Sequence, residues 1–123
     1  SINLLDEVPR TQKMNNDLKG ILGLCRRAGK MSLGHDAAVT SIKQRKAFLA
    51  ITCSDASDRL KKEIADECGF DSRKTKFLTA DFTMQNLGLV IGKKAGVFTI
   101  DEENFANRLY TILTGGHEYD EKI

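Results

Sequence analysis

The chain has 123 residues, of which 41% are apolar and 29% are charged. This length favours one domain that is large enough to bury a core, and the composition is that of an ordinary globular protein. The initial SINLLDEVPR carries acids and has no apolar core, and no apolar run approaches the ~20 residues that span a bilayer, so we expect no secretory signal or membrane span. Three cysteines without CxxC spacing predict free, buried thiols in a reducing cytoplasm.

Positive charge is concentrated in the first half of the chain. Residues 1–50 carry a net charge of +5, residues 51–100 carry +1 and residues 101–123 carry −4, within a total of +2. A basic front half with an acidic tail suggests a surface that faces a polyanion. Ordinary surface charge explains the same distribution equally well.

Residues 1–13 show no periodicity, and we expect them to form a loose arm. The first helix is capped by one of three adjacent residues, Asn15, Asn16 or Asp17. Its apolar stripe has the i, i+3, i+4, i+7 spacing of an amphipathic helix and consists of Leu18, Ile21, Leu22 and Cys25. Gly29 is expected to end this helix.

A short strand is predicted within residues 31–34, followed by a second helix from His35 to about Arg45. The run from Ala47 to Cys53 is apolar without alternation, which is typical of a strand buried on both faces. A third helix then begins after a cap at Asp55 or Ser57 and ends at Gly69.

The remaining elements follow the same alternation. A brief strand begins at residues 77–78, and Asp81 or Thr83 caps a fourth helix. The last strand covers residues 96–100, and Asp101 caps a fifth helix that stops at residues 115–116. The order predicts one domain over residues 14–114, a three-layer α/β/α sandwich with a central mixed four-stranded sheet, followed by an acidic tail at residues 115–123.

The sequence contains few residues that could perform catalysis. GLCRRAGK at residues 23–30 looks like a phosphate-binding loop, but it has one residue too many between its glycines, and it falls on the end of a predicted helix. His35 and His117 are the only histidines, and no Cys/His pair has ligand spacing, so we expect no metal and no cofactor. Cys25 and Cys53 lie in apolar stripes, where thiols are usually inert. We therefore expect no enzymatic activity.

Basic residues surround the second helix and precede the last strand. Arg27 and Lys30 come before the helix, Lys43 and Lys46 lie at its far end, and Lys93 and Lys94 occupy the later loop. If the fold brings some of them to one face, they would contact phosphates.

Two segments resemble the kink-turn RNA-binding ribosomal-protein superfamily of the L-seven-Ae and L-thirty-e type. The first comprises AGK at residues 28–30, Gly34 and KAFLAITCSDAS at residues 46–57, and the second is NLGLVIGKKAGVFTI at residues 86–100. The likeness extends over roughly residues 15–113 and is greatest to the short bacterial paralogues, which are thought to be associated with translation. It implies an α/β/α sandwich that grips RNA with the start of the second helix and the loop before the last strand.

The second helix departs from the superfamily pattern at three positions. Gly34 matches, but Asp36 stands where the kink-turn binders have Asn, Ala37 where they have Glu, and Thr40 where they have Lys. An ionised Asp only accepts hydrogen bonds, and Ala37 offers no acceptor for guanine N–H groups. An acid in the first turn also suits the helix dipole. The resemblance thus implies RNA binding without the side chains of kink-turn recognition.

The leading interpretation is a non-enzymatic, cytoplasmic RNA-binding protein associated with the ribosome or translation. Its expected RNA contacts are Arg27, Lys30, Gly34, His35, Asp36, Lys43, Lys46, Lys93 and Lys94. A protein-interaction module that has lost RNA binding is the first alternative. An enzyme acting on nucleotides is a remote third.

Overall fold

The computed structural model describes residues 14–70 and 75–115. Its elements are α2 (Asn16–Arg27), β1 (Met31–Leu33), α3 (His35–Lys43), β2 (Leu49–Thr52), α4 (Asp58–Phe70), β3 (Lys76–Thr79), α5 (Met84–Ile91), β4 (Val97–Ile100) and α6 (Glu103–Thr114). The predicted alternation of helices and strands is confirmed. Within these ranges no helix combines the length and the apolar character that a bilayer crossing requires. The expected N-terminal arm and nearly all of the acidic tail lie outside the described residues.

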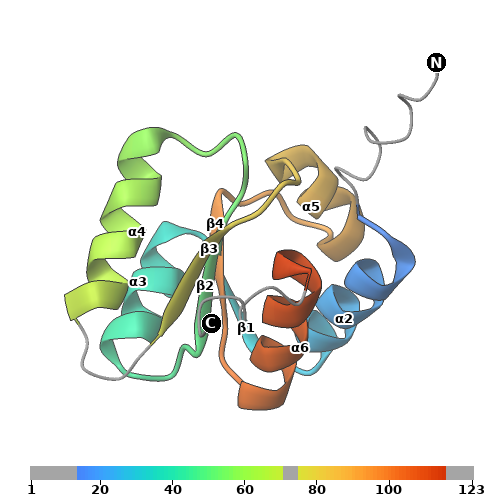
Figure 1. The fold of residues 1–123 in the computed structure, drawn as a ribbon, viewed down its shortest axis with the longest axis horizontal. Coiled ribbons are helices and arrows are strands. Elements are labelled where there is room, and N and C mark those ends of the chain that lie inside the picture. Colours follow the sequence, from blue (N-terminus) through green and yellow to red (C-terminus); the bar gives the residue numbers. More distant parts are fainter. Residues whose placement is uncertain (1–13, 71–74, 116–123) are drawn as a thin grey trace.

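The sheet has the strand order β1-β4-β2-β3. Strand β4 runs antiparallel to both of its neighbours, whereas β2 and β3 run parallel. Helix α4 forms the crossover between the parallel strands, a connection too long for a hairpin turn. The sheet is therefore mixed and four-stranded, as predicted (Figure 1).

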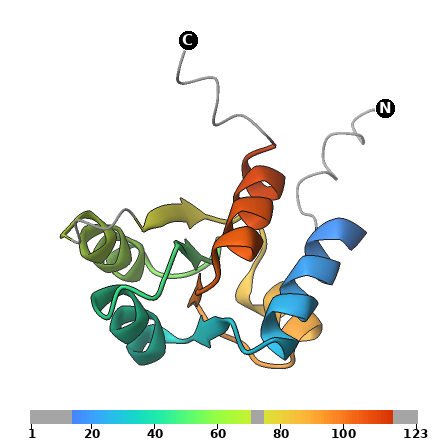
Figure 2. The ribbon, with the colours of Figure 1, turned by 90° about the horizontal axis from the view of Figure 1, so that it is seen from below.

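Helices cover both faces of this sheet, which makes the fold a three-layer sandwich. Helices α3 and α4 lie on one face, and α2, α5 and α6 lie on the other, as Figure 1 and Figure 2 show. Adjacent residues of β2 point to opposite layers: Ala50 packs in the cluster with Ile64, and Ile51 packs in the larger cluster with Leu22 and Phe98. Every residue of β2 is buried, which confirms the prediction of a strand covered on both faces.

Several capping predictions are confirmed at the atomic level. The Asn15 side chain accepts a hydrogen bond from the Leu18 backbone N–H at 2.8 Å and begins α2. Ser57 does the same for the N–H of Leu60 at 3.0 Å. Thr83 and Asn86 exchange side-chain and backbone bonds in a capping box at the start of α5. These short polar side chains therefore set where the helices begin.

Three helix boundaries differ from the prediction. Helix α3 ends at Lys43, because Arg45 adopts a left-handed backbone with a φ of 65°. Helix α4 runs past Gly69 to Phe70, since a glycine inside a last turn is tolerated. The cap of α6 is Glu102, whose carboxylate accepts from the Phe105 N–H at 2.8 Å, and not Asp101.

Asp101 is turned away from the helix because three hydroxyl groups donate to it. Ser32 of β1 donates at 2.7 Å, Ser41 of α3 at 2.8 Å and Thr99 of β4 at 2.8 Å. The Asp101 backbone N–H also donates to the Lys30 carbonyl at 2.8 Å. This half-buried carboxylate thus joins β1, α3 and the end of β4.

Candidate functional site

The two ends of the sheet differ in which helices begin there. Strands β1, β2 and β3 finish at one end, and the helices that follow them, α3, α4 and α5, begin at that same end. We call it the helix-start end, and we call the opposite one the far end. Each helix N-terminus carries a partial positive charge and unpaired N–H groups. The helix-start end therefore favours anions before any side chain is considered.

The start of α3 is open to such an anion. Gly34 has a φ of 92°, which favours glycine, and no side chain caps the first turn that follows it. Its own N–H donates to the Val97 carbonyl at 2.9 Å, which places the helix start beside the first residue of β4. The loop of residues 92–96, which leads into β4, consequently lies next to the start of α3.

The loop after β2 completes this end of the molecule. The Cys53 N–H donates to the Gly96 carbonyl at 2.9 Å, and Asp55 Oδ1 accepts from the Met84 N–H at 3.0 Å. A Cβ on Gly96 would lie 3.2 Å from Leu60 Cδ2, so the chain passes close to α4 here. The starts of α3, α4 and α5 and the loop of residues 92–96 thus meet in one place.

Lys93 and Lys94 supply positive charge at this end. Both are exposed, and no described side chain forms an ion pair with either. A Cβ on Gly88 would lie 3.0 Å from Lys94 Cγ, so the stem of Lys94 crosses α5 at a glycine. The φ of 85° at Gly92 turns the chain out of α5 and into this basic loop.

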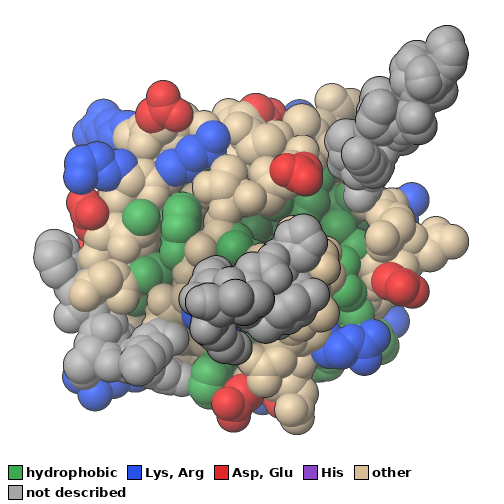
Figure 3. Space-filling view, in the orientation of Figure 1, with side chains coloured by type: hydrophobic (Ala, Val, Ile, Leu, Met, Phe, Trp, Pro, Cys, Tyr) green, Lys and Arg blue, Asp and Glu red, His purple; other side chains and the backbone are tan. Residues whose placement is uncertain are grey.

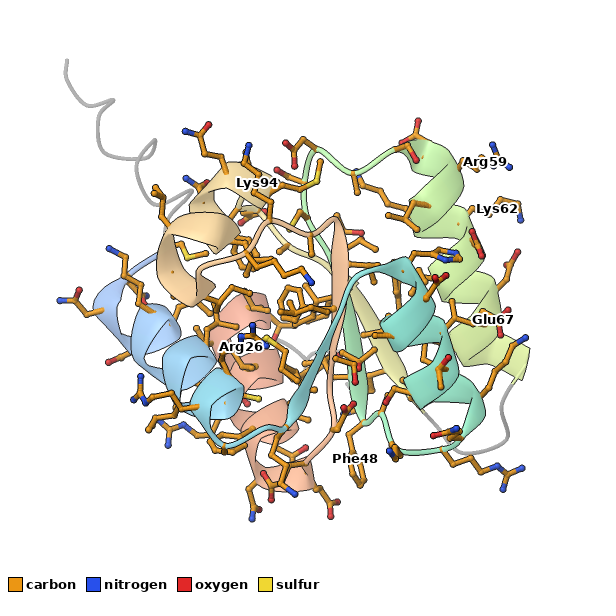
Figure 4. The ribbon with its side chains drawn as sticks, turned by 180° about the vertical axis from the view of Figure 1, so that it is seen from behind. Arg26, Phe48, Arg59, Lys62, Glu67 and Lys94 are labelled. Atoms are coloured by element: carbon orange, nitrogen blue, oxygen red, sulfur yellow. The ribbon has the colours of Figure 1, made fainter. Side chains whose placement is uncertain are left out.

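Sequence reasoning missed three cations on the first turns of α4. Lys61 Nζ donates to the Ser54 carbonyl at 2.9 Å, Lys62 forms an ion pair with Asp66 at 3.2 Å, and Arg59 is exposed. Figure 4 shows Arg59 and Lys62 projecting outward from α4, and Lys94 beside α5. Figure 3 shows Lys and Arg side chains gathered where α4 begins. The sequence could have indicated these cations, because they directly follow the predicted cap of this helix, Asp55 or Ser57.

His35 links α3 to α4. Its Nε2 lies 2.7 Å from Glu63 Oε2, and its Nδ1 lies 3.2 Å from Asp36 Oδ1. The hydrogen bond to Glu63, followed by the one to Asp36, raises the pKa of His35 above its ordinary value of 6.5. The two carboxylates therefore favour the protonated form of His35, which ties the first residue of α3 to α4.

The three departures from the superfamily pattern line one groove on α3. Asp36, Ala37 and Thr40 share this groove, which has a volume of about 330 Å³ and reaches Lys46. A base placed beside these three residues would meet the Asp36 carboxylate and the Thr40 hydroxyl. The amide of Gln44 and the ammonium of Lys46 line the groove farther along. The groove thus differs from the superfamily pattern in the hydrogen-bonding groups that these three positions present.

The structure separates the remaining predicted residues from the helix-start end. Lys30 precedes β1 and Gly34 follows it, so the strand holds the two roughly 10 Å or more apart. Lys43 lies in the last turn of α3 and Lys46 follows the end of that helix, so both lie toward the far end. Arg27 ends α2, where it lines a groove of about 690 Å³ between α2 and α5. The predicted set is therefore divided between three places.

The cysteines are poor nucleophiles. Burial, helped by the charges of Asp101 and Glu102, raises the pKa of Cys25 to about 12, and burial beside Asp55 does the same for Cys53. Their thiols donate to the backbone carbonyls of Lys30 and Ala95. Across residues 14–70 and 75–115, no group of three or more His, Cys, Asp or Glu side chains could hold a metal ion.

Comparison with known proteins places the chain in a family. No protein-family model matches it. A protein named RNA-binding protein YlxQ from Bacillus subtilis (strain 168) is 32% identical over 94 residues, which are 76% of this chain and 91% of that protein. A protein of the same name from Enterococcus faecium is 28% identical over 111 residues, which are 90% of this chain and 100% of that protein.

Two solved structures share the fold. A protein of unknown function from Bacillus halodurans has a TM-score of 0.72 and 28% identity, and the match covers 78% of this chain and 95% of that one. The Giardia lamblia 15.5kD RNA binding protein has a TM-score of 0.63 and 15% identity, with 93% and 98% covered. The chain belongs to the YlxQ family, within the L-seven-Ae-like superfamily that its sequence resembles.

Proposed function

We propose that this protein binds structured RNA at its helix-start end. One observation carries the proposal: the starts of α3, α4 and α5 converge there with the loop that holds Lys93 and Lys94. The names of the YlxQ relatives and of the Giardia structure support RNA as the ligand.

The convergence suits a phosphate backbone. Helix N-termini and exposed lysines both attract phosphates, and their combined effect falls as salt rises, because binding releases counterions. Lys93, Lys94 and Arg59 come from two different segments, so they can contact phosphates that are separated along an RNA strand. Phosphate contacts of this kind position the RNA without reading its sequence.

Base recognition falls to the groove on α3. Asp36 can accept a hydrogen bond from a base amino group, whereas Ala37 contributes none. Since a missing bidentate contact to a base removes ~1–3 kcal/mol of discrimination, we propose that the protein prefers a kink-turn only weakly over other structured RNA.

The setting we propose is the translation machinery of the cytoplasm, with ribosomal RNA as the first candidate ligand. The resemblance of two segments to ribosomal proteins supports this assignment. The proposed role is binding without catalysis. In support, the cysteines Cys25 and Cys53 are held as inert thiols by a pKa of about 12.

A matched pair of double variants tests the proposal. Lys93→Glu/Lys94→Glu changes the helix-start end, and Lys30→Glu/Lys43→Glu makes the same change of charge toward the far end. RNA affinity is measured for both, and for the unmodified protein, at several salt concentrations. The first variant should weaken binding and reduce the slope of log K against log salt by about 0.7 to 0.9 for each lost phosphate contact.

The second variant should lose less affinity than the first. An equal loss in both variants would mean that binding follows net charge, which contradicts a localised site. Salt-independent binding, or no binding at low salt, in the unmodified protein would overturn the proposed function itself.

A further inference from the structure

We propose that the far end holds a second RNA contact, a pocket that takes one unpaired base. The pocket has a volume of about 190 Å³ and lies between α6 and the starts of β2 and β3. The inference goes beyond the proposed function, because it concerns the end of the sheet that the structured RNA does not require.

The backbone brings the two walls of this pocket together. The Lys76 N–H donates to the Phe48 carbonyl at 3.1 Å, so these two residues stand side by side at the beginning of β3 and β2. Glu103, Asn107 and Tyr110 follow one another at i, i+4 and i+7, which places them on one face of α6. All five residues line the pocket.

The lining combines aromatic rings with hydrogen-bonding groups. Phe48 is half-buried at the far end, where Figure 4 shows its ring, and Tyr110 is half-buried on α6. Single-stranded RNA is recognised by stacking bases on such rings and by hydrogen bonds to their edges. Glu103 can only accept a hydrogen bond when ionised, while the Asn107 amide can donate and accept. This set suits an unpaired base whose edge presents an N–H donor to Glu103.

Lys76 supplies a positive charge that can contact the phosphate of the bound nucleotide. Its Nζ lies 4.3 Å from the centre of the Tyr110 ring. A cation–π contact at an exposed site is weak, so a phosphate can draw the ammonium away and leave the ring face to a base. Lys30 and Lys46 stand at the same end, since the Asp101 N–H donates to the Lys30 carbonyl beside Ile100, and the Phe48 N–H donates to Ile100. These lysines can contact the phosphates on either side of a bound base.

Tyrosine fluorescence provides a direct readout. The chain has no tryptophan and two tyrosines, Tyr110 and Tyr119, so a Tyr119→Phe background leaves Tyr110 as the sole emitter. This protein is titrated with short unstructured oligo(rA), oligo(rC) and oligo(rU), and with adenosine monophosphate alone. We expect oligo(rA) to change the Tyr110 emission and to bind more tightly than oligo(rC) or oligo(rU), because its larger purine ring stacks more strongly on an aromatic side chain.

Two variants and a matched control locate the binding. Phe48→Leu keeps an apolar side chain and removes the ring, and should weaken oligo(rA) binding at least about fivefold. Asn107→Ala should weaken it as well, whereas Asn104→Ala, an exposed asparagine of α6 outside the pocket, should leave it unchanged. Unchanged affinity in both Phe48→Leu and Asn107→Ala would overturn the inference.

Two further measurements distinguish binding at this pocket from binding at the helix-start end, and binding of RNA from binding of a free nucleotide. Lys93→Glu/Lys94→Glu should retain oligo(rA) binding at the pocket while it loses structured RNA. Loss of both would show that the oligonucleotide uses the helix-start end, which overturns the second site alone. Adenosine monophosphate that binds as tightly as oligo(rA) would overturn RNA as the occupant.

Discussion

The two ends of the sheet both carry lysines, yet they offer RNA different chemistry. The helix-start end combines three helix N-termini with Lys93 and Lys94, and its groove on α3 lacks aromatic side chains. The far end holds Lys76 beside the ring of Tyr110, in a pocket that Phe48 also lines. The first arrangement suits phosphates, and the second suits an unstacked base. A count of positive charges would not distinguish them.

This difference shows that the direction of each strand determines at which end of the sheet the charged residues before and after it lie. Lys30 and Gly34 are close in sequence, but β1 carries the chain from one end of the sheet to the other between them. Residues 92–96 are distant in sequence, and the bond between the Gly34 N–H and Val97 brings them to the α3 start. Four predictions, in order of decreasing effect, test how separate the two ends are.

The largest effect is a loss of stability, and it is expected for a substitution in the sheet, which connects the helix-start end to the far end. Ile51 is fully buried in the middle of β2, so Ile51→Ala should lower the free energy of unfolding by about 2–5 kcal/mol. Denaturant melts measure this loss. Leu89 is 79% exposed, and Leu89→Ala as the control should change stability by less than about 0.5 kcal/mol. Comparable losses in the two variants would mean that β2 is not central.

The second prediction concerns the stability that the Asp101 carboxylate provides by holding β1 and α3 to the end of β4. Asp101→Ala leaves three hydroxyls, those of Ser32, Ser41 and Thr99, without their carboxylate and should cost about 2 kcal/mol or more. Asp101→Asn keeps one oxygen for Ser41 and Thr99 and should cost less. If the two variants unfold at the same denaturant concentration as the unmodified protein, the carboxylate does not hold β1 and α3 to β4.

The third prediction sharpens the chemistry of the helix-start end. Asp36→Asn with Ala37→Glu and Thr40→Lys restores the superfamily pattern on α3 and should favour a kink-turn over a plain internal loop by ~1–3 kcal/mol. Paired titrations with the two RNAs measure this preference before and after the change. A strong preference in the unmodified protein would show that other residues read the bases. No gain in the variant would assign the difference to the loop of residues 92–96.

The smallest effect is the dependence on pH. Folding raises the pKa of His35 through Glu63 and Asp36, so the resulting stabilisation is fully present below about pH 6.5 and is lost as pH rises through the folded-state pKa. An NMR titration of the His35 ring should give a pKa above 6.5 that falls in Glu63→Gln. Glu67→Gln, farther along α4, is the control and should leave the pKa unchanged. A value at or below 6.5 in the unmodified protein would exclude the link between α3 and α4.

Local signals predicted the fold well, because caps and apolar runs act over short distances. Asn15, Ser57 and Thr83 each bond to an N–H three residues later, and the continuous apolar run at β2 is buried throughout. Asp101 was misassigned as a cap because its partners lie in β1 and α3, far away in the sequence.

The candidate site was harder to predict, because it depends on which loops meet. The superfamily resemblance identified the start of α3 and the loop of residues 92–96, which do lie together. Lys30 and Lys43 were grouped with them on sequence proximity, and the structure places both toward the other end. Tyr110 and Asn107 were not singled out, since a helical spacing does not reveal which residues of a neighbouring strand stand opposite.

Mapping of RNA binding onto the backbone amides tests the central claim most directly. A ¹⁵N-labelled protein is titrated with a structured RNA while its amide resonances are followed. The account predicts the largest shifts at the first turn of α3, residues 35–37, and in the loop of residues 92–96, with the far end changing less. Shifts confined to the far end, or spread evenly over both ends, would contradict the assignment of structured RNA to the helix-start end.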